Sequence, residues 1–267
     1  MQNQSSQWLI PVLLAAGAGL ALWYYWINVS EPLPTAEPTP PPPVEAPEPM
    51  PGPLHPVAPV AETPAERPDL VPLPPLNESD EYFKLELSEV FGAGLEAMLA
   101  DTRMIERIVA TVDSLPRSHV AERIRPLGRL DDAFLVDGQD DSGGFTISPD
   151  NYRRYDGLVT MALSADVGAV AELYRRYYPL FQDAYVDLGY PQGYFNDRLV
   201  EVIDHLLATP DVGDPVGLVR PHVLFEYEDP DLEALSSGQK LMLRMGSEHA
   251  NSLKSRLREL RALITNL

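Results

Sequence analysis

The chain divides into three stretches by the pattern of its apolar and polar residues. Residues 8–27 form an apolar run without a charge, residues 28–76 are rich in proline and acidic side chains, and residues 77–267 mix apolar and polar positions. In the third stretch apolar residues recur every three or four positions, which is typical of helices with one buried face. We therefore predict a mainly α fold: a single helical domain with a small β-hairpin, preceded by one transmembrane helix and a Pro-rich linker.

The predicted helices of the domain begin at capping residues and end near glycine or proline. Asn77 or Ser79 is expected to cap the first helix, which Gly92 interrupts, and Asp101 to cap the second, which Pro116 ends. The later helices are predicted over residues 148–163, 164–189, 196–208, 237–245 and 247–265, and Asp229-Pro230 is expected to open a short turn of helix.

Two short apolar runs predict the β-hairpin. Residues 134–136 and 144–147 flank the turn-rich sequence DGQDDSG, and residues 223–227 are predicted as a further strand. The aspartates of this turn are potential calcium ligands, but the spacing of an EF-hand loop is missing. A solvated turn is therefore the favoured interpretation.

The apolar run at 8–27 has the length of a membrane span. At about 1.5 Å per residue a helix of this length covers about 30 Å, the thickness of the hydrocarbon core. Trp8 lies at one end and the aromatic sequence WYYW at the other, as in the aromatic belts of membrane helices. A cleaved signal peptide is the alternative, but its basic start and small-residue cleavage site are missing. We expect residues 1–7 to form a short cytoplasmic stub and residues 8–27 to lie in the lipid bilayer.

Proline dominates the stretch between the apolar run and the domain. Most of the 28 prolines of the chain fall within residues 28–76. Proline lacks an amide hydrogen and fixes φ, so this segment is expected to adopt an extended polyproline II conformation. Acidic residues at intervals keep it solvated. The favoured interpretation is a semi-rigid spacer, and the alternative is a ligand for a Pro-binding module.

The charge and the cysteine content exclude several classes of function. The formal net charge of −20 repels phosphate backbones, and nucleic-acid binding requires a basic surface. The chain contains no cysteine, which excludes disulfides, thiolate metal sites and cysteine nucleophiles. The sequence also lacks the motifs of serine nucleophiles and of phosphate-binding loops. We therefore predict no cofactor and no nucleic-acid partner.

The sequence YRRYYPLFQDAY at 174–185 carries the densest aromatic signal. On a helix its aromatic residues fall within one arc of about 100°. The first interpretation is a core-facing side whose hydroxyls reach the rim. The second is an aromatic groove for a sugar or an extended peptide. The candidate residues of this groove, including neighbours that follow in the chain, are Tyr174, Tyr177, Tyr178, Phe181, Tyr185, Tyr194, Asn196 and Arg198.

The sequence GYFNDRLVEVIDHLLATP at 193–210 carries the polar candidates. Asn196 is interpreted as the N-cap of a helix or, alternatively, as a buried amide. Glu201 and His205 are spaced i, i+4, with Asp197 one turn earlier, a spacing that suits ligands to a zinc or another divalent ion. Ion pairing on a solvated helix is the alternative for these side chains and is the favoured one.

Five sequence segments resemble the family called Domain of Unknown Function 3014. They are LPPLNESD, ATVDSLPR, YRRYYPLFQDAY, GYFNDRLVEVIDHLLATP and SSGQKLMLRMG, which together span residues 73–246. The resemblance implies a bacterial envelope protein with an N-terminal anchor and a Pro-rich spacer. It implies no activity, cofactor or catalytic residue, so no functional residue is transferred from the family.

These observations favour a non-enzymatic binding or scaffolding module. We expect a single-pass protein of the bacterial inner membrane, with its soluble domain in the periplasm and an envelope protein or cell-wall polymer as partner. The orientation rests on a weak charge argument, because no Lys or Arg flanks residues 8–27 closely. The alternatives are an envelope enzyme, with Glu201 and His205 assisting through a metal ion, and a structural subunit of an envelope complex.

Overall fold

A computed structural model describes residues 52–57, 72–129, 133–139 and 144–265. The predicted transmembrane segment at 8–27 and most of the Pro-rich linker lie outside these residues. Within them, no single helix is both long and apolar enough to cross a bilayer, although the sharply bent pair formed by residues 156–164 and 167–187 meets that test by length and composition. The description below concerns the compact unit Met50–Leu267.

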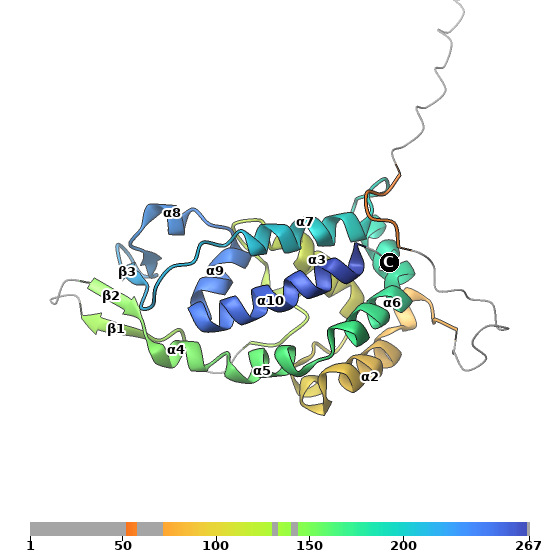
Figure 1. Cartoon of the computed structure of the whole chain (residues 1–267), viewed down its shortest axis with the longest axis horizontal. Coiled ribbons are helices and arrows are strands. Elements are labelled where there is room, and N and C mark those ends of the chain that lie inside the picture. Colours follow the sequence, from red (N-terminus) through yellow and green to blue (C-terminus); the bar gives the residue numbers. More distant parts are fainter. Residues whose placement is uncertain (1–51, 58–71, 130–132, 140–143, 266–267) are drawn as a thin grey trace, which may run out of the picture. The chain divides into compact units, whose positions relative to one another are not determined.

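Helices make up most of the described domain (Figure 1). Short 3-10 turns, Leu76–Glu78, Ala93–Met98 and Glu122–Ile124, connect some of them. The α-helices are α2 (Asp80–Phe91), α3 (Met104–Ser114), α4 (Pro149–Arg153), α5 (Asp156–Ser164), α6 (Val167–Asp187), α7 (Phe195–Leu207), α8 (Pro230–Glu233), α9 (Ser237–Arg244) and α10 (Ser247–Ile264).

Local sequence explains several helix starts. Ser148 caps α4 by accepting a hydrogen bond from the amide of Asp150, and Pro149 occupies the first helical position, as predicted. Ser236 forms a capping box with Gln239 at the start of α9. Such caps satisfy backbone groups that a helix leaves without partners.

Other helix starts differ from the prediction. Asp101 does not cap α3; the carboxylate of Asp80 on α2 accepts hydrogen bonds from the amides of Arg103 and Met104 instead. Ser164 belongs to the end of α5, and Asp166 caps α6 by accepting from the amide of Ala169. The predicted helix 148–163 is divided into α4 and α5. A cap supplied by a neighbouring helix leaves no signal in the local sequence.

The β-hairpin is confirmed and belongs to a four-stranded antiparallel sheet. Strands β1 (Val136–Gln139), β2 (Gly144–Ile147), β3 (Gly217–Val219) and β4 (Glu226–Tyr227) lie in the order β1-β2-β3-β4. The sequence did not predict β3. The predicted strand 223–227 is reduced to β4, because Val223 and Leu224 are highly exposed in the loop between β3 and β4.

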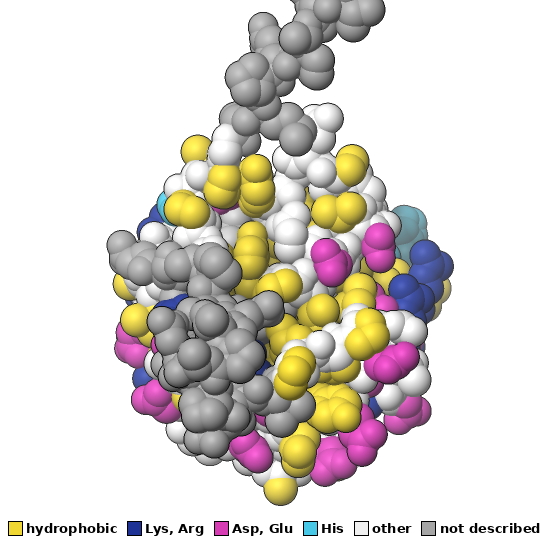
Figure 2. Space-filling model, turned by 90° about the vertical axis from the view of Figure 1, so that its right-hand side faces the viewer, with side chains coloured by type: hydrophobic (Ala, Val, Ile, Leu, Met, Phe, Trp, Pro, Cys, Tyr) yellow, Lys and Arg dark blue, Asp and Glu magenta, His cyan; other side chains and the backbone are white. Residues whose placement is uncertain are grey.

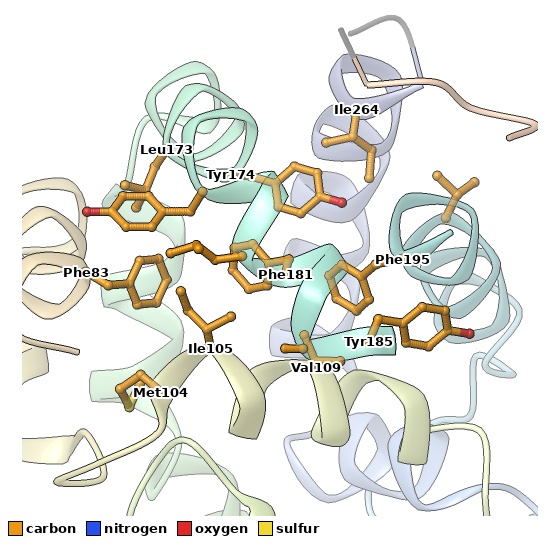
Figure 3. Packing of buried hydrophobic residues seen from close by; sticks show 14 of the residues in the cluster. Phe83, Met104, Ile105, Val109, Leu173, Tyr174, Phe181, Tyr185, Phe195 and Ile264 are labelled. Atoms are coloured by element: carbon orange, nitrogen blue, oxygen red, sulfur yellow. The ribbon is translucent and has the colours of Figure 1, made fainter. Parts of the chain in front are cut away.

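The main core lies between α2, α3, α6, α7 and α10 (Figure 3). The ring of Phe83 from α2 meets the rings of Tyr177 and Phe181 edge to face, and Phe181 stacks on Phe195 of α7 with 5.5 Å between ring centroids. Met104 of α3 is fully buried in the same cluster. Aromatic pairs in these geometries stabilise the core beyond the area they bury.

Candidate functional site

The aromatic residues of α6 belong to the core and not to an exposed groove. Tyr174, Tyr177, Phe181 and Tyr185 are each at most 9% exposed, and Tyr177 donates a hydrogen bond to Glu86 at 2.9 Å. Burial raises the pKa of the Tyr174 hydroxyl well above its usual value. The core interpretation therefore describes these four side chains.

The start of α7 brings together the remaining candidates of the predicted groove. Tyr194 is the N-cap residue but makes no capping bond with its side chain. Gln182 of α6 supplies that bond instead, because its Oε1 accepts from the amide of Phe195 at 2.9 Å. The hydroxyl of Tyr178 donates to the same oxygen at 3.2 Å. Tyr178 and Tyr194 are half-buried.

Asn196 is a buried amide and not the N-cap, which corrects the favoured prediction. Its Oδ1 accepts a hydrogen bond from the hydroxyl of Tyr174 at 3.0 Å, and its Nδ2 donates to the carbonyl of Ile264 at the end of α10 at 3.0 Å. These two bonds fix the amide within the domain. Its second Nδ2 hydrogen donates to the carbonyl of His55 at 2.9 Å.

His55 belongs to a short piece of the Pro-rich segment, residues 52–57, which we call the strap. Asp197 of α7 binds its backbone: one carboxylate oxygen accepts from the amide of Leu54 at 2.9 Å, and the other from the amide of His55 at 2.8 Å. Figure 1 shows the strap in orange beside α7. Asn196 and Asp197 together form what we call the backbone-binding site.

The strap lies on the domain as an extended chain. Pro53, His55 and Val57 are partly buried, whereas the residues between them are exposed, an alternation that is typical of extended backbone. The side chain of Leu54 is 81% exposed. The hydrogen bonds from Asn196 and Asp197 to the strap use its backbone and not its side chains.

An acidic side chain lies further along α7 on the strap side. Asp204 accepts two hydrogen bonds from Arg261 of α10, at 2.6 and 2.8 Å. The pKa of Asp204 is lowered mainly by the bond from Arg261, with a smaller contribution from the charge of His55. Figure 2 shows the end of the domain where α2 and α6 lie: apolar side chains gather across the middle of this face, and acidic ones lie around its margins.

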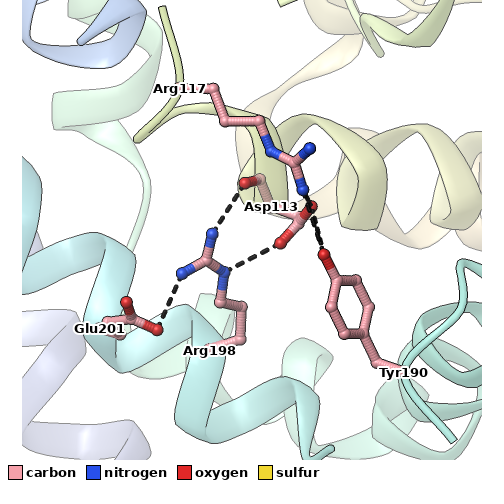
Figure 4. A network of polar contacts seen from close by, with 5 residues as sticks. All are labelled: Asp113, Arg117, Tyr190, Arg198 and Glu201. Atoms are coloured by element: carbon pink, nitrogen blue, oxygen red, sulfur yellow. Dashed lines mark hydrogen bonds and ion pairs between the residues drawn. The ribbon is translucent and has the colours of Figure 1, made fainter.

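Arg198, which directly follows Asp197 in α7, contacts a different cluster of side chains (Figure 4). Its Nε donates to Oδ1 of Asp113 on α3 at 3.0 Å, and its Nη2 donates to the backbone carbonyl of Asp113 at 2.9 Å. Arg117 and Tyr190 donate to the other oxygen of the same carboxylate. Glu201 completes the group by pairing with Arg198 at 2.8 Å. We call these five residues the Asp113 cluster.

The Asp113 cluster joins three parts of the domain around one buried carboxylate. Asp113 is 4% exposed, and both of its carboxylate oxygens accept hydrogen bonds from neighbouring side chains. The negative charge of Asp113 raises the pKa of Arg117. Tyr190 also stacks on Tyr185, with 4.6 Å between ring centroids. Removing one partner from this group would leave a buried charge unpaired, which is strongly destabilising.

Glu201 and His205 have separate protein partners. Glu201 pairs with Arg198, and Nε2 of His205 lies 2.8 Å from the hydroxyl of Ser236. Asp197, the third residue of this candidate metal-binding set, binds the strap. Over the part of the chain that the structure describes, no group of three His, Asp or Glu residues is placed to hold a metal ion.

The sequence interpretation missed the strap, although a signal was present. Residues 49–61 carry no acidic residue, whereas acidic residues recur through the rest of the linker. An apolar interruption in an acidic spacer is expected where the spacer contacts a protein surface. The roles of Asp113 and Asp197 had no such signal, because their partners are distant in the sequence.

The site and the fold define a mainly helical domain that holds an extended piece of its own linker. The chain belongs to the family described as Protein of unknown function (DUF3014), whose model matches residues 104–261, more than half of the chain. The match includes the whole backbone-binding site and the whole Asp113 cluster. No curated protein and no solved structure matches the chain.

Proposed function

We propose that this protein is a non-enzymatic binding or scaffolding module of the bacterial envelope. In this proposal residues 8–27 anchor the chain in the inner membrane, residues 28–76 act as the tether, and the domain lies in the periplasm. The apolar run and the Pro-rich composition support the anchor and the tether. The partner in this proposal is an envelope protein or a cell-wall polymer.

The single observation that carries the binding function is the contact between Asp197 and the strap. One carboxylate accepts two successive backbone amides, and the neighbouring Asn196 donates to the carbonyl that follows. Backbone-directed contacts of this kind are how proteins bind extended peptides. The domain thus contains a working arrangement for holding an extended chain, which a scaffold requires.

The contact also gives the tether a second function. Because the strap is attached to the domain, only residues 28–51 separate the domain from the predicted anchor. At about 3.1 Å per residue, this stretch reaches roughly 75 Å when extended. A scaffold of this kind positions its domain at a limited distance from the bilayer.

A membrane-topology experiment tests the anchor and the compartment. Cells producing the full chain are fractionated, and protease is added to intact cells and to spheroplasts. The expected result is a carbonate-resistant membrane protein whose domain is digested only in spheroplasts. A matched chain lacking residues 8–27 is expected to leave the membrane fraction. A domain that stays protected in spheroplasts, or a full chain that is washed from the membrane, would contradict the proposal.

A further inference from the structure

Asn196, one of the two residues of the backbone-binding site, is held in place by contacts within the domain. Asn196 is fully buried and is oriented by Tyr174 and Ile264, both within the domain. Its remaining amide hydrogen points to the carbonyl of His55. Pre-ordering of this kind lowers the entropic cost of binding an extended chain. The site therefore has the character of a binding site with a ligand in place.

The chemistry of the site selects a particular kind of chain. Each carboxylate oxygen of Asp197 accepts from one amide, so the ligand needs two successive residues that are not proline. Pro53 and Pro56 flank this pair in the strap, and Pro56 restricts the backbone of the preceding His55 to extended conformations. Several other non-proline stretches of the linker, as in TAE and VEA, include acidic residues that Asp197 and Asp204 would repel. Val57-Ala58, which Pro56 and Pro59 flank, is a second pair of the same non-acidic pattern.

We propose that the backbone-binding site is a recognition site for extended, non-acidic peptides of the pattern Pro-X-X-Pro, and that the strap occupies it as a competing ligand in cis. This inference deepens the proposed function, because it assigns the scaffold a ligand class and a site. A peptide from another chain binds by replacing the strap. Displacement also releases the strap, so that the reach between the anchor and the domain grows from roughly 75 Å for residues 28–51 to about 135 Å for residues 28–71 at full extension.

The occupancy of the site in cis follows from the short connection between strap and domain. Residues 58–71 join the two, and a connection of this length gives an effective ligand concentration in the millimolar range. A weak backbone contact is then sufficient to keep the site filled. A peptide from another chain has to compete with this effective concentration of the strap. Removing the strap from the site therefore strengthens the apparent binding of that peptide.

The test uses the full chain in mild detergent and a synthetic peptide of residues 49–58 with blocked ends. Binding is measured by ligand-observed NMR, which detects weak complexes. The double substitution Leu54→Pro with His55→Pro vacates the site in the protein, because it removes both amides that Asp197 accepts. A control peptide carries the same two prolines.

The vacated chain is expected to bind the peptide several-fold more tightly than the wild-type chain. Adding Asp197→Asn to the vacated chain is expected to weaken binding about tenfold, the effect of losing charge-assisted hydrogen bonds. Asp183→Asn, which changes an exposed carboxylate of α6, is the matched control and is expected to leave binding unchanged. Circular dichroism verifies that each variant is folded.

Three results would overturn the inference. The site does not recognise peptides if the vacated chain binds the wild-type peptide no more tightly than it binds the control peptide. The same conclusion follows if Asp197→Asn does not change the affinity for the wild-type peptide. Equal affinity of the wild-type and vacated chains would show that the strap does not compete. Neither measurement depends on the compartment or on the anchor, so failure here is distinguishable from failure of the membrane-topology experiment.

Discussion

Asp197 and Arg198 are neighbours in the first turn of α7, yet their surroundings differ completely. Arg198 contacts a buried carboxylate of α3 within a cluster in which each charge has a protein partner. Asp197 is partly exposed and accepts two backbone amides from the Pro-rich segment. Closed side-chain clusters join elements of a fold, whereas a carboxylate aimed at backbone amides suits a chain that binds from outside.

The comparison predicts that the Asp113 cluster governs stability more strongly than the backbone-binding site. Asp113→Ala leaves the guanidinium of Arg198, only 17% exposed, without its main partner. We expect the free energy of unfolding of the full chain to fall by about 3 kcal/mol, the cost of breaking a buried ion pair. Urea unfolding followed by circular dichroism measures this change. An unfolding midpoint equal to that of the wild type would contradict the stabilising role of the Asp113 cluster.

Asn196 of the backbone-binding site is held in the core and also donates to the strap. Asn196→Ala removes the partners of the Tyr174 hydroxyl and of the Ile264 carbonyl, so we expect a loss of about 2 kcal/mol in unfolding free energy. Tyr174→Phe, which removes one hydroxyl only, is the control and should cost about 1 kcal/mol. Equal losses in the two variants would show that the Ile264 and strap contacts contribute nothing.

The smallest effect is expected at Asp204, where the ion pair with Arg261 is open to solvent. Because its pKa in the folded state lies below the usual 3.8, the stabilisation is complete above that value and is lost as pH falls through the folded pKa. Asp204→Asn should therefore lower stability by roughly 0.5 kcal/mol at neutral pH and by less near pH 3. Urea unfolding at both pH values measures the difference. If the stability difference between the wild type and Asp204→Asn instead grows on acidification, the direction assigned to the pKa shift of Asp204 is wrong.

Most of the helical framework was predictable from the sequence. The apolar positions of α3 and α7 recur with a helical period, and proline or serine marks the starts of α4, α8 and α9. These signals are local, so a single segment contains them. The starts of α3 and α6 were misplaced because Asp80 and Asp166 supply the caps, and the prediction assigned Asp101 and Ser164.

The candidate site was predicted only in part. The segments that border it, 174–185 and 193–210, were correctly singled out by their aromatic and polar density. The roles within them were not, because burial decides whether a tyrosine lines a groove or fills a core. Asn196 shows the same limit, since a cap and a buried amide share one local pattern.

The sequence by itself determined the class of the domain, the family and the positions of most helices, because periodicity and capping act over a few residues. Only the tertiary structure decided which neighbours meet across the fold. The strap and α7 are more than 140 positions apart, and the three hydrogen bonds between them use backbone atoms of the strap that carry no sequence signature. Contacts of that kind depend on how the packed helices position Asn196 and Asp197, and this information is spread over the whole chain.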